Sequence, residues 1–407
     1  MGLCRFLPTP SDRMGLLWSL LSVKGSIVLE YGPAGTTHYS MGFLGKLGVE
    51  QEEQLFTTHM SEDDVIMGDV SRLENSIVEL DESYSPKVIF VVASSTSEVI
   101  GTDIKGVCRY MQPEVNAKLI PCDVGGFRGD YTVGVAFAYN HIVKNLTAPT
   151  DEVKNNFNLL GLSVGNYRAH SDKHEVIRLL KEGFNLETGA VLCCETSVSQ
   201  IEQMSSAKIN IVVGYEAIKT AQYLEKKFGT PYIVGMPYGY TGTKKWLEQI
   251  GEVLEQAPDA TLMKEIDSKI SDTSFYKMYG RMFKKAPKAC IVGDYDRVVG
   301  LSTLMEDFGA TVENKISLHT LKAVKEEVSD ISYFENEGEK MQALESISDT
   351  FLLADEISIM LANDTNKSMC VNSPTVYKTQ TATHLPIVGV RGTDMIREAY
   401  DEYIRTL

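Results

Sequence analysis

The sequence lacks the cysteine patterns that hold secreted or zinc-stabilised domains together. Its seven cysteines are scattered over 407 residues, and no Cys-x-x-Cys pair occurs. An odd number of cysteines in so long a chain argues against a disulfide framework, and their spacing argues against a zinc ribbon. We therefore expect reduced thiols, as in cytoplasmic proteins.

Long hydrophobic runs are also lacking. Apolar stretches such as Val88–Ala93 are far shorter than the roughly 20 residues that a membrane-spanning helix needs. The chain start does not combine a basic region, an apolar run and a small-residue cleavage site, so no signal peptide is indicated. These absences predict a soluble, cytoplasmic protein with no membrane partner.

Positive charge is scarce, because 39 Lys and Arg residues against 55 Asp and Glu residues give a formal net charge of −16. This balance argues against nucleic acid or an anionic membrane surface as a partner. Neither a P-loop nor a GxGxxG pattern occurs, so ATP hydrolysis by this chain is not expected. The Gly32–Gly35 piece could cradle a phosphate, but a tight strand–helix connection is the favoured interpretation.

The pattern that is present is an alternation of short apolar runs, rich in β-branched residues, with helical periodicity. This alternation is typical of parallel α/β units, and the length suits two or three domains. We predict an α/β fold of three Rossmann-like domains, each with a small parallel sheet flanked by helices. The predicted domains are residues 1–148, 149–286 and 287–407.

Three short pieces near the start of the chain can face one shared site. They are Leu3–Arg5, Glu30–Thr36 and Ser94–Asp103, and each lies where a strand or chain end gives way to a helix. Cysteine occurs in the first piece alone, as Cys4, and the adjacent Arg5 favours its thiolate form. Cys4 is therefore the thiol that we consider as a metal ligand.

The other polar candidates are better explained by structural roles. His38 and His59, with Asp63 and Asp64 near His59, lack the spacing of a metal site, so ordinary surface or hydrogen-bonded histidines are favoured. The catalytic residues are unknown from the sequence. Polar side chains on expected strand-end loops, each favoured as structural over catalytic, are Asp123, Arg128, Asp130 and His170.

The remaining cysteines are predicted to be buried and inert. Cys193 and Cys194 end an expected strand, where adjacent side chains face opposite ways, so they cannot easily chelate one metal. The others lie in or beside apolar runs and have the same interpretation: Cys108, Cys122, Cys290 and Cys370.

The order of the motifs resembles the component-1 family of nitrogenase and nitrogenase-like oxidoreductases over nearly the full length. The ordered set is far more specific than any one motif. The matching pieces are Cys4 with the Pro-containing turn and the Met14–Leu21 helix, Tyr31–Gly35, Thr57–Gly68, Ser97–Ile104, Ile291–Asp294 and Gly389–Gly392.

The resemblance implies an iron–sulfur cluster buried between two homologous subunits. The family's three cysteine positions fall here on Cys4, Thr36 and Ser95, so one thiolate is kept. An all-cysteine [4Fe–4S] cluster needs four thiolates. The resemblance is closest to the β-like subunit of the cofactor-assembly scaffold, where an α-like partner supplies three cysteines and Cys4 would supply the fourth. Thr36 and Ser95 would then donate hydrogen bonds to cluster sulfurs, with helix or turn capping as the alternative.

The resemblance further implies electron delivery by a separate iron protein, which alone would bind ATP. The first interpretation is a reductase subunit of a nitrogenase-like complex. The alternatives are a non-catalytic scaffold for metallocluster assembly and a structural β-like partner of a catalytic α-like subunit. The substrate, and whether the complex is a dimer or a tetramer, are not indicated.

A second cluster position distinguishes members of the family. The piece Ile209–Tyr215 resembles the region where active nitrogenase subunits hold a larger metallocluster through a cysteine, and Gly214 falls at that position. A cofactor-holding nitrogenase α-subunit is therefore disfavoured. A relative of the dark-operative tetrapyrrole reductases stays open, because those bind an organic substrate.

Overall fold

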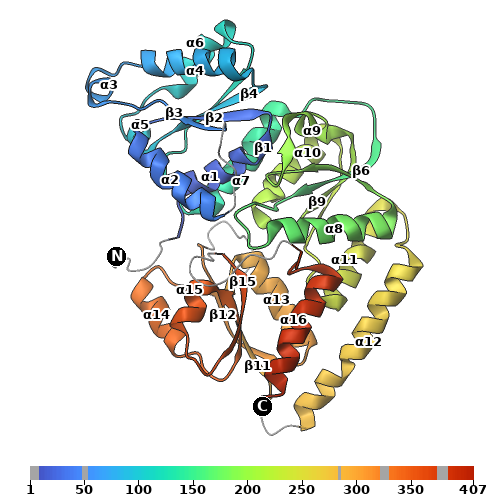
Figure 1. Cartoon of the computed structure of the whole chain (residues 1–407). Helices are drawn as coiled ribbons and strands as arrows, with labels where there is room; N and C mark the ends of the chain where they lie inside the picture. Colours follow the sequence, from blue (N-terminus) through green and yellow to red (C-terminus); the bar gives the residue numbers. More distant parts are fainter. Residues whose placement is uncertain (1–8, 48–53, 283–285, 321–329, 374–383) are drawn as a thin grey trace.

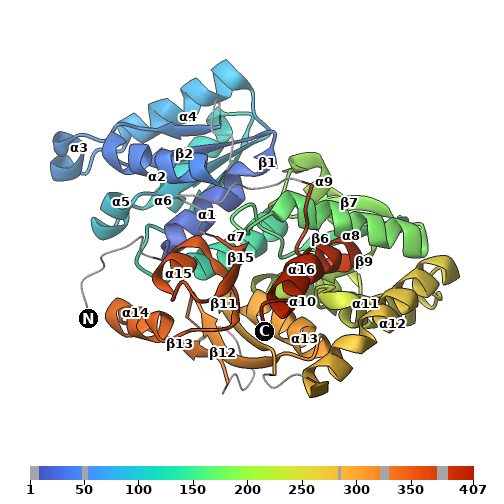
Figure 2. The same cartoon turned by 60° about the horizontal axis from the view of Figure 1, so that its bottom comes forward.

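The computed structural model describes residues 9–47, 54–282, 286–320, 330–373 and 384–407. Within these ranges the chain forms three larger parallel sheets, each flanked by helices, as Figures 1 and 2 show. The prediction of an α/β fold with several small parallel sheets is confirmed. No helix in the described ranges is long and apolar enough to span a membrane.

The first sheet has the strand order β3-β2-β4-β5, and every neighbouring pair is parallel. Its central strands are buried along their whole length. The strands are β2 (Ser26–Tyr31), β3 (Leu55–Thr57), β4 (Val88–Ala93) and β5 (Lys118–Cys122). The accompanying helices are α1 (Asp12–Leu21), α2 (Ala34–Lys46), α3 (Glu62–Met67), α4 (Ser71–Tyr84), α5 (Ser95–Val99), α6 (Ile104–Met111), η1 (Gln112–Glu114) and α7 (Tyr131–Leu146).

The second sheet has the order β10-β9-β6-β7 and is also parallel. Its strands are β6 (Lys154–Leu160), β7 (Glu187–Val191), β9 (Ala207–Val212) and β10 (Tyr232–Val234). Its helices are α8 (Ala169–Phe184), α9 (Val198–Glu202), η2 (Met204–Ser206), η3 (Tyr215–Ala217), α10 (Ile218–Phe228) and α11 (Gly239–Leu254). A two-stranded parallel ladder of β1 (Val23–Lys24) and β8 (Thr196–Ser197) joins the two regions.

The third sheet has the order β13-β12-β11-β14-β15, with parallel neighbours. The long helix α12 (Ala260–Met282) leads to it along one side of the molecule, as Figure 1 shows. The strands are β11 (Lys288–Gly293), β12 (Thr311–Ser317), β13 (Ser332–Tyr333), β14 (Phe351–Asp355) and β15 (Lys367–Asn372). The helices are α13 (Tyr295–Asp307), α14 (Glu337–Glu345), α15 (Glu356–Leu361) and α16 (Gly389–Ile404).

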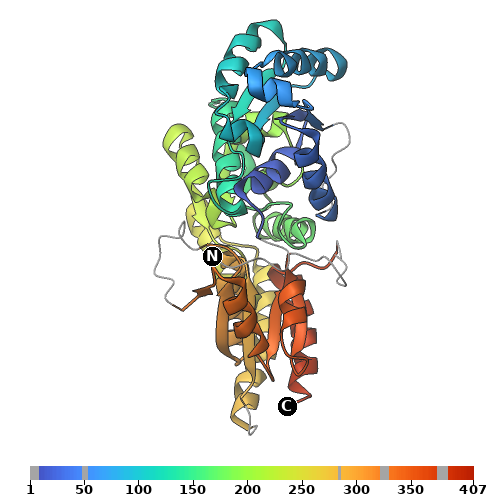
Figure 3. The ribbon, with the colours of Figure 1, turned by 90° about the vertical axis from the view of Figure 1, so that its left-hand side faces the viewer.

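The hydrophobic cores continue from one sheet region to the next. One core packs α1 and α7 against both the first sheet and the second, and another joins side chains of the second and third sheet regions. In Figure 3 the third sheet and its helices form the lower part of the molecule, and the first two sheets form the upper part. The expected boundaries at 148/149 and 286/287 fall between the strands of neighbouring sheets, and the three-domain division itself stays a prediction.

Helix α1 is buried at all ten positions, including the charged Asp12 and Arg13. It packs closely along α7, because a β-carbon on Gly15 would lie 2.1 Å from the carbonyl oxygen of Tyr131, and one on Gly134 would lie 1.7 Å from that of Asp12. The contact fixes α1 against α7, and Arg13 of α1 forms an ion pair with Glu30 near the carboxyl end of β2, where the candidate site lies.

Candidate functional site

The candidate site lies where β2 and β4 end and give way to helices α2 and α5. Gly32 and Ser94 meet there, because a β-carbon on Gly32 would lie 2.4 Å from the β-carbon of Ser94. A third loop joins them through the Gly125 amide, which donates a hydrogen bond of 2.6 Å to Glu98 Oε2. The expected approach of the second and third sequence pieces is therefore present. The first piece, with Cys4, lies outside the described residues.

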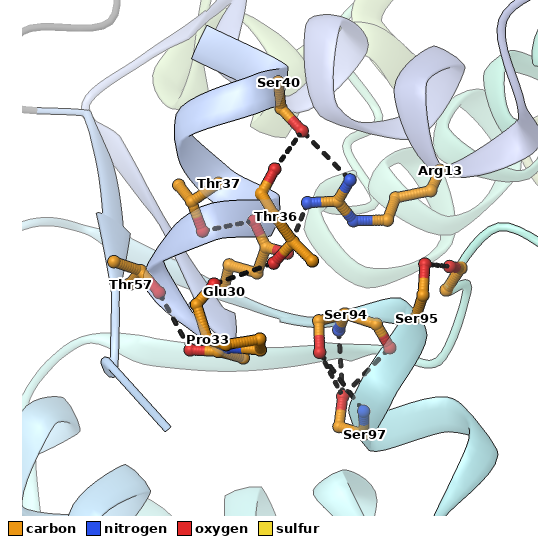
Figure 4. Close-up of polar contacts among 12 residues, drawn as sticks. Arg13, Glu30, Pro33, Thr36, Thr37, Ser40, Thr57, Ser94, Ser95 and Ser97 are labelled. Carbon is orange, nitrogen blue, oxygen red and sulfur yellow. Dashed lines mark hydrogen bonds and ion pairs between the residues drawn. The ribbon is translucent and has the colours of Figure 1, made fainter. Parts of the chain in front are cut away.

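The middle of this site is occupied by a buried ion pair between Arg13 on α1 and Glu30 on β2, drawn in Figure 4. The exposed fractions of the two residues are 6% and 0%. Thr37 Oγ1 donates to Glu30 Oε2 at 2.9 Å, and Arg13 Nη1 donates to Ser40 Oγ at 3.0 Å. This network pairs the two charged groups through residues of α1, β2 and α2, and it leaves Arg13 Nε buried without a hydrogen-bond partner among the described residues.

Thr36 lies in the first turn of α2, above the ion pair. Its hydroxyl donates to the Pro33 carbonyl oxygen at 2.8 Å, with Glu30 Oε1 as a longer second contact at 3.4 Å. The helix begins at Ala34, so the Gly32–Gly35 piece, for which a tight strand–helix connection was favoured, is partly helical. The Thr36 hydroxyl proton therefore already has acceptors within its own chain.

Ser95 begins α5 but does not cap it. The capping box of α5 is formed by Ser94 and Ser97, whose side chains exchange hydrogen bonds with each other's backbone amides. The Ser95 hydroxyl instead donates to the Gly125 carbonyl oxygen at 2.6 Å, as Figure 4 shows. Ser95 thus joins two of the converging loops, and its role beside a cluster stays a prediction.

An iron–sulfur cluster held by the described residues does not fit this site. The two expected ligand positions carry hydroxyls that donate to protein oxygens, and none of the described cysteines is at the site. The described ranges also contain no group of three or more His, Cys, Asp or Glu side chains that could hold a metal ion. Cys4, the expected ligand, lies outside the described residues, so its place at a cluster stays a prediction.

Five of the six described cysteines are buried, as expected, whereas Cys370 is only partly buried, so the prediction of burial is wrong for that residue. Burial raises the pKa of Cys108 and of Cys290 to about 12, and it raises the pKa of Cys122 well above its ordinary value. Cys193 and Cys194 are fully buried, and burial raises the pKa of both. Since a thiolate is the metal-binding form, these cysteines are unsuited to ligation.

The polar residues considered around His59 have structural roles. Asp64 forms a capping box with Ser61 at the start of α3 and an ion pair of 2.8 Å with Arg72. These hydrogen bonds, the backbone bond from Ser61 first, lower the pKa of the Asp64 carboxyl. His59 itself has a positive φ of 52° and is exposed.

The strand-end candidates are likewise engaged in structural contacts. Asp130 caps α7 through the Thr132 amide and accepts a hydrogen bond of 2.9 Å from the Thr320 amide. Arg128 contacts both Glu98 and Asp123, at 3.3 and 3.4 Å. His170 lies 3.5 Å from Glu195, and burial lowers the pKa of its imidazole.

The second cluster position is closed by backbone. A β-carbon added at Gly214 would lie 2.4 Å from the carbonyl oxygen of Gly161, whose own φ is 91°. Backbone at that distance cannot yield as a flexible side chain does, so a cysteine at position 214 would require the two loops to separate.

Sequence reasoning missed Arg13, Glu30 and a cleft next to the site. The cleft lies between the first and third sheet regions and encloses a volume of about 100 Å³. Trp18, Phe43 and Tyr131 line it on one side, and α14 and α15 supply residues on the other. A signal that could have indicated the ion pair was Glu30, a carboxylate directly after the apolar residues Ile27–Leu29.

This chain matches the model of a known protein family. The model of the family described as nitrogenase component 1 type oxidoreductase matches residues 11–403. The solved structure of nitrogenase Cp1 at pH 6.5 superposes with a TM-score of 0.79 over 100% of this chain and 94% of that chain. Its sequence identity is 16%, so this likeness shows the fold alone.

Curated relatives are similar over part of their length. The nitrogenase iron-molybdenum cofactor biosynthesis protein NifE of Clostridium pasteurianum is 30% identical over 289 residues, 69% of this chain and 62% of that protein. The nitrogenase molybdenum-iron protein alpha chain of Methanosarcina barkeri is 27% identical over 248 residues, 59% of this chain and 46% of that protein. The alignments thus span about half to three fifths of these relatives.

Proposed function

This chain belongs to the nitrogenase component 1 type oxidoreductase family, and from that premise we propose that it is one subunit of a hetero-oligomeric complex holding a metal–sulfur cluster. Within that complex it contributes one thiolate, from Cys4, to a [4Fe–4S] cluster shared with a homologous α-like subunit. The partner supplies the other three cysteines, because an all-cysteine cluster of this type needs four.

The observation that carries this proposal is that two loops converge at the candidate site although neither of them supplies a cysteine. The loops after β2 and β4 approach each other closely, yet Thr36 and Ser95 stand where the family resemblance places cysteines. The chain therefore has the frame of a cluster site and depends on a partner for most of the ligation. This dependence supports a β-like place in the complex.

Exposed apolar side chains around the same loops support a partner subunit. Helices α2, α3 and α5 all follow the carboxyl ends of parallel strands and so lie at one edge of the first sheet. Large apolar residues there are 65–78% exposed: Tyr39, Ile66, Met67, Val99 and Phe127. Apolar groups gathered on one surface are typical of an interaction site.

Electrons would reach the shared cluster from a separate ATP-dependent iron protein. The sequence supports this division of labour because it has no P-loop of its own. The reduced thiols are consistent with a cytoplasmic complex. In this proposal the chain is a subunit of a nitrogenase-like reductase, and its catalytic residues stay unknown.

A second candidate function is a non-catalytic scaffold for metallocluster assembly. It is favoured by the similarity to proteins named for iron-molybdenum cofactor biosynthesis, which include NifE of Clostridium pasteurianum and NifE of the Nostoc strain PCC 7120. The backbone contact of Gly214 with Gly161 also disfavours permanent attachment of a larger cluster at that position. A structural β-like partner of a catalytic subunit is the third possibility.

Co-expression of the chain with its α-like partner tests the proposal. We expect one [4Fe–4S] cluster per heteromer by iron and sulfide analysis, and a loss of cluster with Cys4→Ala. A complete cluster on the isolated Cys4→Ala chain would refute the shared site. Turnover with the iron protein and ATP would identify a reductase, whereas a second transferable metallocluster without turnover would identify a scaffold.

A further inference from the structure

Two histidines on helix α8 of the second sheet region have the spacing of a metal chelate. Among the seven histidines of the sequence, His170 and His174 are four positions apart, and both lie inside α8. Side chains at positions i and i+4 of a helix lie one turn apart on the same face. This is the arrangement in which two imidazoles of one helix hold a zinc ion.

Both imidazoles can be reached from solvent. The His170 side chain is 38% exposed, and His174 is also exposed. The three residues between them, Ser171, Asp172 and Lys173, are all buried. The two histidines therefore form the solvent-facing surface of this helical turn.

A carboxylate from another loop orients one of the two imidazoles. Glu195 Oε1 lies 3.5 Å from His170 Nδ1. A carboxylate beside one ring nitrogen keeps the proton of a neutral imidazole on that nitrogen and leaves the other nitrogen free to bind a metal. The free nitrogen of His170 is thus Nε2.

The charges around Glu195 keep this carboxylate beside His170. Lys173 Nζ forms an ion pair with Glu195 Oε2, and Lys24 is a further positive charge that acts on Glu195. One carboxylate oxygen therefore faces Lys173 and the other faces His170, so Glu195 orients a ligand and is not itself a ligand. The described ranges contain no group of three His, Cys, Asp or Glu side chains that could hold a metal ion, which agrees with a site of two protein ligands.

The protonation of His170 also suits metal binding. Burial lowers the pKa of its imidazole, Glu195 opposes this effect, and the charges of Lys173 and His174 lower the pKa further. The imidazole is therefore neutral near pH 7, which is the form that binds a metal ion.

We propose that His170 and His174 bind one divalent transition-metal ion such as Zn²⁺, with Glu195 orienting His170 and with water at the remaining positions. Imidazole suits zinc, copper and nickel, whereas magnesium and calcium prefer oxygen ligands. The inference goes beyond the proposed function, because it concerns a separate metal ion on α8 and uses neither Cys4 nor the loops after β2 and β4.

Calorimetric titration of the untagged full chain with zinc chloride tests this binding. The titration uses the Cys4→Ala variant, in which the thiol that we assign to the shared cluster cannot take up zinc. We expect one Zn²⁺ per chain, and no saturable binding of Mg²⁺ in a parallel titration. The absence of saturable Zn²⁺ binding would overturn the site and would leave the proposed cluster untouched, because the cluster depends on Cys4.

Four further substitutions in the same background locate the bound zinc. His170→Gln and His174→Gln should each weaken Zn²⁺ binding by about tenfold or more, because the second imidazole binds intramolecularly. Glu195→Gln should weaken it by about tenfold, since the partner that orients a ligand is lost. His38→Gln, at an exposed histidine of α2, is the matched control and should leave the affinity unchanged. Circular dichroism reports the fold of each variant. Zinc affinity that survives either His170→Gln or His174→Gln would show that the two imidazoles do not act together, and the site would be refuted.

Discussion

The guanidinium of Arg13 and the carboxylate of Glu30 form a buried ion pair that joins helix α1 to strand β2. Both residues lie directly under the first turn of α2, where Thr36 and Thr37 add hydroxyl contacts to the same carboxylate. The two expected ligand loops are therefore organised around a polar network of the chain's own side chains.

Removing the cation of this pair is expected to be costly. Arg13→Met leaves the Glu30 charge buried with hydroxyl partners alone, so we predict a loss of about 3 kcal/mol in the free energy of unfolding. Urea denaturation followed by circular dichroism measures it. The double variant Arg13→Met with Glu30→Gln removes both charges and should be more stable than Arg13→Met. A double variant no more stable than the single one would contradict this account of the pair.

Two glycines of one turn provide a matched test of the loop contact. Gly32→Ala pushes a β-carbon to within 2.4 Å of Ser94, whereas nothing lies within 4 Å of a β-carbon at Gly35. We predict that Gly32→Ala lowers the free energy of unfolding by about 1–3 kcal/mol through overpacking. Gly35→Ala, in the first turn of α2, should be neutral or stabilising by up to about 1 kcal/mol. Similar effects of the two substitutions in urea denaturation would show that the loops are not in contact.

The pH dependence of stability should carry a contribution from Asp296. Burial raises the pKa of its carboxyl to about 6 from 3.8, against the hydrogen bond from the Tyr215 amide that lowers it. The pKa of Asp296 is higher in the folded state than in the unfolded state. Its contribution to the free energy of unfolding is therefore complete below pH 3.8 and is lost as the pH rises through about 6. Asp296→Asn should therefore gain stability relative to wild type between about pH 4.5 and about pH 7.

The variant keeps an oxygen that can accept from the Tyr215 amide, so the substitution removes the charge and preserves the contact. Urea denaturation at both pH values gives the difference between variant and wild type, which cancels the titration of carboxyls distant from Asp296. Glu216 is included in the measured effect, because burial and the Asp296 charge together raise its pKa. Asp267→Asn, at an exposed carboxylate of α12, serves as a control. A stability difference between Asp296→Asn and wild type that stays constant with pH would show that Asp296 does not titrate in this range.

The sequence was sufficient for much of the fold because the elements have strong local patterns. The sequence pattern predicts strands over Lys87–Ala93 and Ala117–Cys122, and these are present as β4 and β5, each beginning one residue later, as neighbours in the first sheet. Helix α1 was expected over Met14–Leu21 and extends over Asp12–Leu21. Its complete burial was not predictable, because the glycine contacts with α7 join residues more than 110 positions apart.

The location of the candidate site was predictable from the sequence, but its network of hydrogen bonds and ion pairs was not. Strand-end position and glycine content indicated that the loops near Gly32 and Ser94 would meet, and they do. The pairing of Glu30 with Arg13 depends on the tertiary placement of α1, which local patterns do not encode. Cys193 and Cys194 do not end a strand as expected, since β7 ends at Val191 and Cys193 has a positive φ of 62°. Both thiols are buried, as expected.

The missing ligands can be restored, and this is the sharpest test of the cluster-site interpretation. Thr36→Cys with Ser95→Cys places thiols at the two positions that the family resemblance assigns to ligands. The side chains are similar in volume, so the fold should be kept. We expect the double variant, after anaerobic reconstitution with iron and sulfide, to bind more iron per chain than wild type. The control Ser94→Cys with Thr37→Cys places each thiol one residue away, at the residue that caps α5 and at the residue that donates to Glu30. We expect this control to bind no more iron than wild type. Equal iron content in the two double variants would mean that these loops do not form a cluster site, because thiolate ligation depends on ligand geometry at the site and not on thiol number.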